Sequence, residues 1–295
     1  MLKGSLQGGR VKAGTRSIHA FGGRRVEYKM FKINHILQRS EKIIPWGDKE
    51  KSLSWFGLTD GLLWIEAGDG IIYEYKEPHF NEWDEPIIYN DYQLSRFLED
   101  FFDTFPFVAE SVPDYIYNDI ETFDVRMEKW KSLYYDLSDE EFDEFYFDVY
   151  YELYDPILAR SFDSAHLIGG PNIGCFKNGD RIKLLWKSDY TDEQGNSIWT
   201  SPSGIYEMNY SDFIKEVSRF YEAFIVDMDK QVENVRDNGI SGVYVDIPGL
   251  CRENEMRKEG FEQKLGFLKS GSNSKTDWNK ISELYNRMMN EVSNE

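Results

Sequence analysis

The sequence predicts an α+β fold in which antiparallel β-meanders pack against amphipathic helices. Short apolar runs rich in aromatic residues, separated by Asp-Gly and Asn-Gly turns, predict antiparallel strands within residues 53–75 and 166–208. Apolar residues spaced three or four apart predict long helices over residues 91–105 and 211–237. Groups of strands followed by helices are typical of this fold class.

The first meander is expected to hold three strands. Turns separate them at residues 59–61 and 68–70, and each turn contains an Asp-Gly pair. A polar loop follows at residues 79–86, bounded by Pro86. The three strands are expected at residues 53–58, 62–67 and 71–75.

The first long helix is expected to begin near Asn90 or Asp91, whose side chains can cap free backbone N–H groups. Pro106 should end it, because proline cannot continue a helical hydrogen-bond ladder. A shorter helix is expected near residues 125–134. The apolar face of the first helix consists of Leu94, Phe97, Leu98, Phe101 and Phe105.

A third helix follows a capping box formed by Ser138 and Glu141. One face is predicted to be aromatic and to lie in the core, and the opposite face is acidic. The aromatic face contains Phe142, Phe145, Tyr146, Val149, Tyr150 and Leu153, and the acidic face contains Asp143, Glu144, Asp148 and Glu152.

The second half repeats the order of strands and then a helix. Gly-rich turns at residues 169–171 and 178–180 separate its strands, and Gly239 is placed to end the long helix. Strands are expected at residues 181–186, 198–200, 205–208 and 243–247. An amphipathic helix at the C-terminus would use Trp278, Ile281, Leu284, Tyr285, Met288 and Val292.

The predicted organisation is one α+β domain over residues 30–268. A degenerate duplication would divide it into related halves at residues 30–160 and 161–268, and a coincidental order of elements is the alternative. Residues 269–295 form a linker and the terminal helix. Residues 1–29 contain seven basic residues and one acid, without apolar periodicity, which favours a disordered arm or a spurious extension over an organelle transit peptide.

The run Trp55-Phe56-Gly57-Leu58-Thr59-Asp60-Gly61 resembles the signature of an uncharacterised bacterial family, a domain of unknown function common in Gram-positive genomes. The resemblance extends from about residue 35 to about residue 250. It includes a preceding Pro-Trp-Gly, a Gly-Pro segment, a strand that ends in Trp186, and Trp199-Thr200 before the long helix. It implies a single fold unit and no catalytic residues.

The charge argues against nucleic acid and anionic membranes as partners. The chain has 34 basic and 53 acidic side chains, a formal net charge of −19, whereas phosphate binding needs clustered Lys and Arg. Residues 81–155 alone contain 22 acids and 4 bases. Two distant cysteines and no apolar window long enough to span a membrane indicate a reducing, cytoplasmic setting.

The sequence lacks the motifs of phosphate-binding loops, dinucleotide folds, serine hydrolases and zinc proteases, so we expect no cofactor and no metal. Two weak metal patterns are better explained as polar loops. They are His79 with Glu82, Asp84 and Glu85, and Asp189 with Asp192, Glu193 and Asn196.

The leading functional hypothesis is an acidic protein-interaction module. Its concrete form is an immunity or inhibitor protein that neutralises a basic toxin. The alternative for the same acids is the solvated face of a helix. The predicted binding residues are Asp139, Glu140, Asp143, Glu144, Tyr146, Asp148, Tyr150, Tyr151 and Glu152.

A second hypothesis is a hydrolase with a carboxylate-and-aromatic cleft. Asp60 and Glu66 would be its catalytic pair, beside Trp55, Trp64 and Tyr73. Against it, Asp before Gly is a common turn residue whose side chain bonds local backbone. A third hypothesis is a structural domain whose acidity serves solubility alone.

Overall fold

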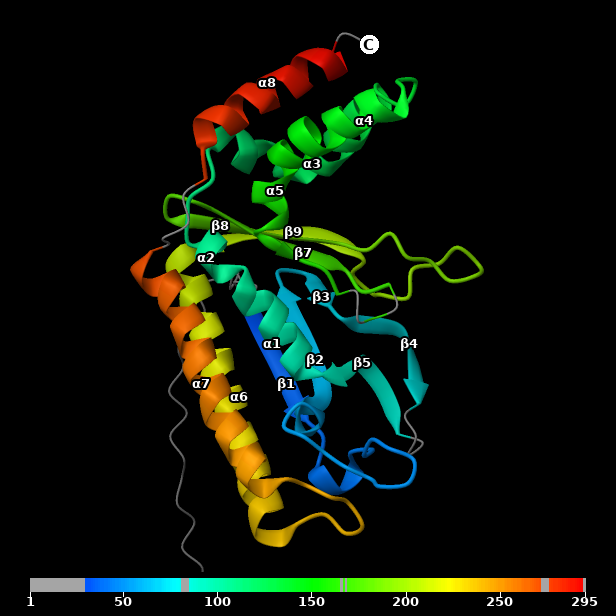
Figure 1. Ribbon diagram of the computed structural model, residues 1–295, viewed down its shortest axis with the longest axis vertical. Coiled ribbons are helices and arrows are strands. Elements are labelled where there is room, and N and C mark those ends of the chain that lie inside the picture. Colours follow the sequence, from blue (N-terminus) through cyan, green and yellow to red (C-terminus); the bar gives the residue numbers. More distant parts are fainter. Residues whose placement is uncertain (1–29, 81–84, 165–166, 168, 272–275, 294–295) are drawn as a thin grey trace, which may run out of the picture.

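The computed structural model describes residues 30–80, 85–164, 167, 169–271 and 276–293. Two antiparallel sheets lie between two groups of helices (Figure 1). A long helical pair runs beside the first sheet, the second sheet crosses the middle of the molecule, and a second group of helices covers its other face (Figure 1). This arrangement confirms the predicted α+β class.

The first sheet has the order β1-β2-β5-β4, with β3 paired to the end of β2. Along β2, every second residue is buried, so one face of the sheet lies in the core and the other faces outward. Its strands are β1 (Phe31–Leu37), β2 (Asp60–Ala67), β3 (Gly70–Ile72), β4 (Glu74–Phe80) and β5 (Pro86–Gln93).

The second sheet has the order β6-β7-β8-β9 and is apolar on both faces. Ile182, Leu184 and Trp186 of β8 point to the main core, whereas Leu185 points to the second group of helices. Because both faces are covered, this sheet joins the two halves of the interior. Its strands are β6 (Ser161–Phe162), β7 (Asn172–Asn178), β8 (Arg181–Lys187) and β9 (Ser203–Asn209).

The main core is closed by α1 (Leu94–Asp103), α2 (Phe105–Val108), α6 (Tyr210–Asn238) and α7 (Ile247–Ser270). Helix α6 also covers the free edge of β1, where Ile33 N donates to Glu216 Oε1 at 2.8 Å. Aromatic contacts continue this packing, since the ring of His35 lies 5.5 Å from that of Phe220. The apolar stripe predicted for α6 is buried, and Gly239 ends the helix with a φ of +63°.

The second group of helices consists of α3 (Asp114–Ser132), α4 (Asp139–Phe145), the π-helical turn η3 (Tyr146–Tyr150), α5 (Tyr151–Leu158) and α8 (Trp278–Ser293). Its own core contains Phe123, Met127 and Trp130 of α3 together with Ile281 and Met288 of α8. The predicted C-terminal helix is therefore confirmed as α8.

A buried ion pair fixes this second group to the rest of the protein. The side chain of Arg160, 0% exposed, donates from Nη2 to Glu110 Oε2 at 2.6 Å and from Nη1 to Pro156 O at 2.6 Å. Glu110 also accepts hydrogen bonds from the N–H and the hydroxyl of Thr276, just before α8. One carboxylate thus joins the end of α5 to the segment that leads into α8.

Several predicted strands and boundaries were wrong. Residues 53–58 form turns, and the strands expected at 198–200 and 243–247 are reduced to single bridges. Asp60, expected in a turn, is the first residue of β2. The expected polar loop at 79–86 instead contains the end of β4 and the start of β5, and α1 begins only at Leu94.

Two residues of the motif at residues 55–61, Trp55 and Thr59, have a structural role. Trp55 is 0% exposed and donates from Nε1 to Asn254 Oδ1 of α7 at 2.8 Å. The hydroxyl of Thr59 bonds Ser95 Oγ at 3.1 Å, at the start of α1. The motif therefore ties the segment before β2 to two helices.

The two sheets share one continuous core, in which Tyr75 stacks on Trp199 with ring centroids 4.7 Å apart. Their strand orders differ, since only the first sheet has a strand inserted out of sequence order. The predicted division at residues 160 and 161 falls next to the buried Arg160. The basic segment 1–29 lies outside the described residues, as do residues 272–275 of the predicted linker.

Cys175 and Cys251 are both free thiols. Each helix in the described ranges is either too short or too polar to cross a lipid bilayer.

We predict that Glu110→Ala lowers the free energy of unfolding by about 3–5 kcal/mol, because it leaves the buried Arg160 guanidinium unpaired. Urea denaturation monitored by circular dichroism would measure it. The control is Asp189→Ala, which breaks an exposed ion pair with Lys187 and should cost less than about 1 kcal/mol. Equal losses in the two variants would contradict this role for Glu110.

Candidate functional site

The acidic helix predicted from sequence lies at one end of the molecule, on α4 and η3 (Figure 1). Five of its carboxylates are exposed, and none of them forms a hydrogen bond or ion pair with any residue that the structure describes. They are Asp139, Glu140, Asp143, Glu144 and Asp148.

Most other acids of the segment 81–155 are engaged by neighbours. Glu99 pairs with Arg257, Asp119 with Arg126, and Glu128 with Lys131. Asp103 pairs with Lys264, and Asp114 accepts a hydrogen bond from Asn178. The uncompensated charge of this segment is therefore concentrated on α4 and η3.

Two aromatic rings lie exposed beside these carboxylates. Phe147 is 62% exposed and stacks on Tyr151, which is 39% exposed, with ring centroids 6.3 Å apart and planes 9° apart. Neighbouring exposed aromatic rings rimmed by polar residues are a feature of protein-interaction surfaces. We call the five carboxylates with Phe147 and Tyr151 the acidic–aromatic face.

Three other predicted binding residues are held by the protein itself. Tyr150 is buried, and its hydroxyl donates to Glu128 Oε1 at 3.1 Å, so burial and that carboxylate raise the pKa of Tyr150. Tyr146 is half-buried, with Lys131 Nζ 5.9 Å from its ring centre. Glu152 pairs with Lys280 of α8. These residues support the face rather than form its outer surface.

The local sequence explains the shape of this face. Ser138 and Glu141 form the predicted capping box, in which Glu141 N donates to Ser138 Oγ at 3.4 Å and Ser138 N donates to Glu141 Oε2 at 3.3 Å. Hydrogen bonds from Ser138 lower the pKa of Glu141. Phe145 and Tyr150, at the two ends of the π-turn, are buried, and Phe147 between them is exposed.

Phe147 is absent from the binding residues predicted from sequence, although the predicted aromatic face of this helix already leaves it outside. On a helix of 3.6 residues per turn, position 147 lies on the side opposite the face that holds Phe145, Tyr146 and Tyr150. The helical period therefore offered a usable signal for its exposure, and the prediction overlooked it because it selected only acids and tyrosines as binding residues.

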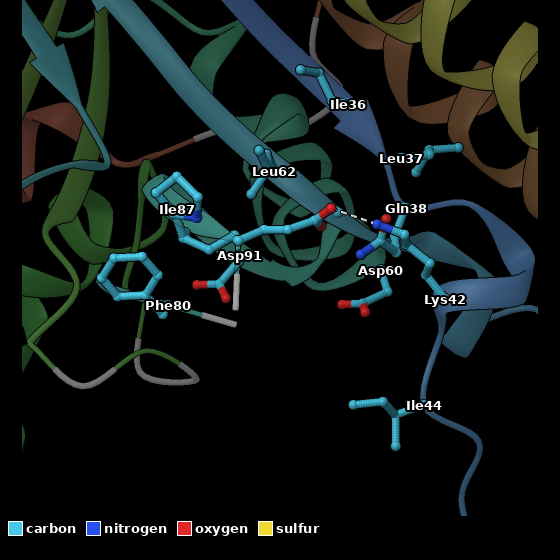
Figure 2. A pocket seen from close by; sticks show the side chains of 13 residues that line it. Ile36, Leu37, Gln38, Lys42, Ile44, Asp60, Leu62, Phe80, Ile87 and Asp91 are labelled. Atoms are coloured by element: carbon cyan, nitrogen blue, oxygen red, sulfur yellow. Dashed lines mark hydrogen bonds and ion pairs between the residues drawn. The ribbon is translucent and has the colours of Figure 1, made fainter. Parts of the chain in front are cut away.

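The second candidate region is the outward face of the first sheet, where Asp60 lies. Asp60 and Asp91 line one groove with a volume of about 440 Å³ (Figure 2). Glu66 does not lie with them, because it is six residues further along β2, roughly 20 Å away at about 3.3 Å per residue. Glu66 instead accepts a hydrogen bond from Asn34 Nδ2 at 3.0 Å.

Strand register brings Asp60 and Asp91 together. Asp60 pairs with Gln93 and Leu62 pairs with Asp91, so the two carboxylates are diagonal neighbours on the same face, roughly 7–8 Å apart at Cα. Burial, and secondarily the charge of Asp91, raise the pKa of Asp60. Asp91 in turn contacts His79 Nε2 at 3.2 Å.

The aromatic residues expected to line a catalytic cleft are divided between two places. Trp55 and Tyr73 are buried in the core. Trp64 lies on the outward face of the sheet and stacks on Tyr89, with centroids 4.2 Å apart and planes 11° apart. A cleft containing Asp60, Glu66 and all three rings is therefore not formed.

Within the described ranges, no group of three or more His, Cys, Asp or Glu side chains converges as metal ligands would. Of the weak pattern around His79, Glu82 and Asp84 lie outside the described residues. In the second pattern, Asp192 Oδ1 accepts backbone hydrogen bonds from Gln194 and Asn196, which confirms a polar loop.

The fold and these two regions define an α+β domain with an acidic–aromatic helical face and a carboxylate-bearing groove on its first sheet. The chain belongs to the Family of unknown function (DUF5984), which it matches over residues 32–284. This confirms membership of an uncharacterised domain family, and residues 1–29 lie outside the match, as expected. None of the curated proteins and none of the solved structures matches the chain.

We predict that Asp60→Asn makes the protein more stable at pH 7. A carboxyl whose pKa is raised on folding from its ordinary value of 3.8 lowers stability as the pH rises through the interval between the two pKa values. The amide removes that penalty, so its advantage in Tm should be present at pH 7, shrink as the pH falls through the raised pKa, and vanish below the ordinary value of 3.8. Thermal unfolding across this range would measure the difference.

The control for this prediction is Asp148→Asn, which neutralises an exposed carboxylate without a partner among the described residues. Its Tm should follow that of the wild type at every pH. A stabilisation by Asp60→Asn that does not change with pH would refute the assignment to ionisation of Asp60.

Proposed function

We propose that this protein is a cytoplasmic interaction module that binds a basic protein through the acidic–aromatic face. Its concrete form is an immunity or inhibitor protein that neutralises a basic toxin. The observation that carries the proposal is the combination of five uncompensated carboxylates with the exposed Phe147–Tyr151 pair on one helical surface. Charge supplies attraction over distance, and the rings supply contact area.

The charges suit rapid capture of a cationic partner. Clustered charges of one sign raise association rates with an oppositely charged partner. Their electrostatic attraction extends over roughly 10 Å at about 0.1 M salt. If the partner is a nuclease, its substrate-binding cleft is basic, because it must bind phosphate. A row of exposed carboxylates would occupy that cleft in place of the nucleic acid.

The supporting residues keep the face rigid, which limits the entropy lost on binding. Phe145 stacks on Tyr134 with ring centroids 3.6 Å apart, beneath α4. The indole of Trp130 and the hydroxyl of Tyr134 each donate to Glu291 of α8 at 2.6 Å. The face is therefore held by both α3 and α8.

The hydrolase alternative receives less support from the geometry. Carboxylates that act on one glycosidic bond lie within about 10 Å of each other, and Asp60 and Glu66 are separated by about twice that distance along β2. The alternative of a structural domain predicts that no specific partner exists. Capture of a basic partner from cells separates this alternative from the proposal.

We predict that neutralising all five carboxylates of the face to Asn or Gln weakens binding of the basic partner about 10- to 100-fold, mainly by slowing association. The partner would first be captured from cells at about 0.1 M salt. It would be released at about 1 M salt, where screening shortens the range of electrostatic attraction to roughly 3 Å. Surface plasmon resonance with the purified partner would then give both rate constants.

The matched control neutralises five other exposed carboxylates that have no partner in the described part of the chain: Glu50, Glu77, Glu193, Glu222 and Glu259. The net charge changes equally, but these residues are scattered, so binding should remain near the wild-type value. Failure to capture any basic protein at either salt concentration, or equal loss in both variants, would exclude the proposed function.

A further inference from the structure

The outward face of the first sheet carries a groove lined by residues of β1, β2 and β5. These strands lie on the side of the second sheet opposite α4 (Figure 1). The floor of the groove is formed by β1, β2 and β5, and its margins by residues 37–44 on one side and by the ends of β4 and β5 on the other (Figure 2). Ile36, Leu62 and Ile87 contribute apolar surface, and Asp60 and Asp91 contribute the acids.

Backbone geometry fixes the floor of this groove. A Cβ added to Gly61 would lie 2.3 Å from the carbonyl oxygen of Ile36, so β2 approaches β1 at a distance that a larger residue would prevent. Gln38 N also donates to the carbonyl oxygen of Asp60 at 2.7 Å. Asp60 is therefore carried on a strand whose position against β1 is fixed by the backbone.

The groove has an excess of negative charge that apolar atoms surround. Lys42 at its margin pairs with Glu85 at 2.6 Å, so these two charges offset each other. Within the described residues, Asp60 has no ion-pair partner, and its pKa is raised by burial and by Asp91. A cation placed between Asp60 and Asp91 would relieve this repulsion.

The margin of the groove exposes apolar side chains. Phe80 is 63% exposed, Ile36 is 55% exposed and Ile44 is 47% exposed. All three border the same cavity as the two carboxylates. A complementary ligand therefore carries a positive charge at one end and a hydrocarbon segment at the other.

We propose that the groove binds a small free amine, a primary ammonium group on a short aliphatic chain. The ammonium contacts Asp60 and Asp91, and the chain lies against Ile36, Leu62 and Phe80. The volume of about 440 Å³ is within the range of small-molecule pockets, which favours a free amine over a side chain of a folded protein. The site is separate from the acidic–aromatic face and does not depend on the proposed function.

The test is an NMR titration of the ¹⁵N-labelled full chain with n-pentylamine at pH 7 and constant ionic strength. We expect saturable shifts centred on the amides of Gly61, Leu62 and Asp91. The neutral analogue n-pentanol should give no saturable shifts there, because it lacks the charge. Nα-acetyl-lysine methylamide, which carries the same ammonium on a peptide backbone, should bind more weakly than n-pentylamine, because its two amide groups lose water against the apolar margin of the groove.

Two variants locate the binding site, and a third is the control. Asp60→Asn and Asp91→Asn should each weaken n-pentylamine binding by about tenfold or more, whereas Glu222→Gln, at an exposed carboxylate outside both sites, should leave it unchanged. The proposal fails if no saturable shift occurs, if n-pentanol binds equally, or if Asp60→Asn binds as the wild type does. Binding of the blocked lysine as tight as that of n-pentylamine would overturn the assignment to a free amine.

Discussion

The buried pair of Arg160 and Glu110 is the interaction on which the arrangement of the two helical groups depends. The Arg160 guanidinium lies 5.1 Å from the ring centre of Trp278. The backbone carbonyl of Arg160 accepts a hydrogen bond from Cys175 N of β7. Burial lowers the pKa of Arg160, and the charge of Glu110 opposes that effect. Because an unpaired charge is costly in a protein interior, both residues must stay together. Helix α8 is thereby positioned, and α8 in turn supports α3 and the acidic–aromatic face.

The acids of this protein have two distinct roles that composition alone does not separate. Those near the sheets and the helical pair are used internally, as in the pairs of Glu99 with Arg257 and of Asp103 with Lys264. Those on α4 and η3 have no such partners among the described residues. The sequence located the acidic segment correctly, but only the fold shows that its uncompensated part is limited to about one helix.

Periodicity predicted the elements whose patterns are strong. The long helix α6, the apolar face of α1 and the capping box of Ser138 were found because each depends on local spacing. Helix α7 was missed because its pattern is weak and Gly260 and Gly266 interrupt it. Asp60 was misplaced because Asp-Gly is typical of turns, whereas Gly61 is needed here for close approach to Ile36. The proximity of Asp60 to Asp91 depends on β5, in which Asn90 and Asp91 continue a strand, whereas the sequence predicted that one of them begins a helix.

Helix stability explains some of the exposed carboxylates but not all of them. Asp139 and Glu140 lie in the first turn of α4, where the helix dipole favours negative charge. Asp143, Glu144 and Asp148 lie beyond that turn, and like charges four residues apart destabilise a helix by about 0.2–0.5 kcal/mol per pair. The π-turn at residues 146–150 also replaces regular helical geometry, and such turns are frequent at functional sites. The features that stability leaves unexplained are therefore the same ones that binding of a cationic partner would use.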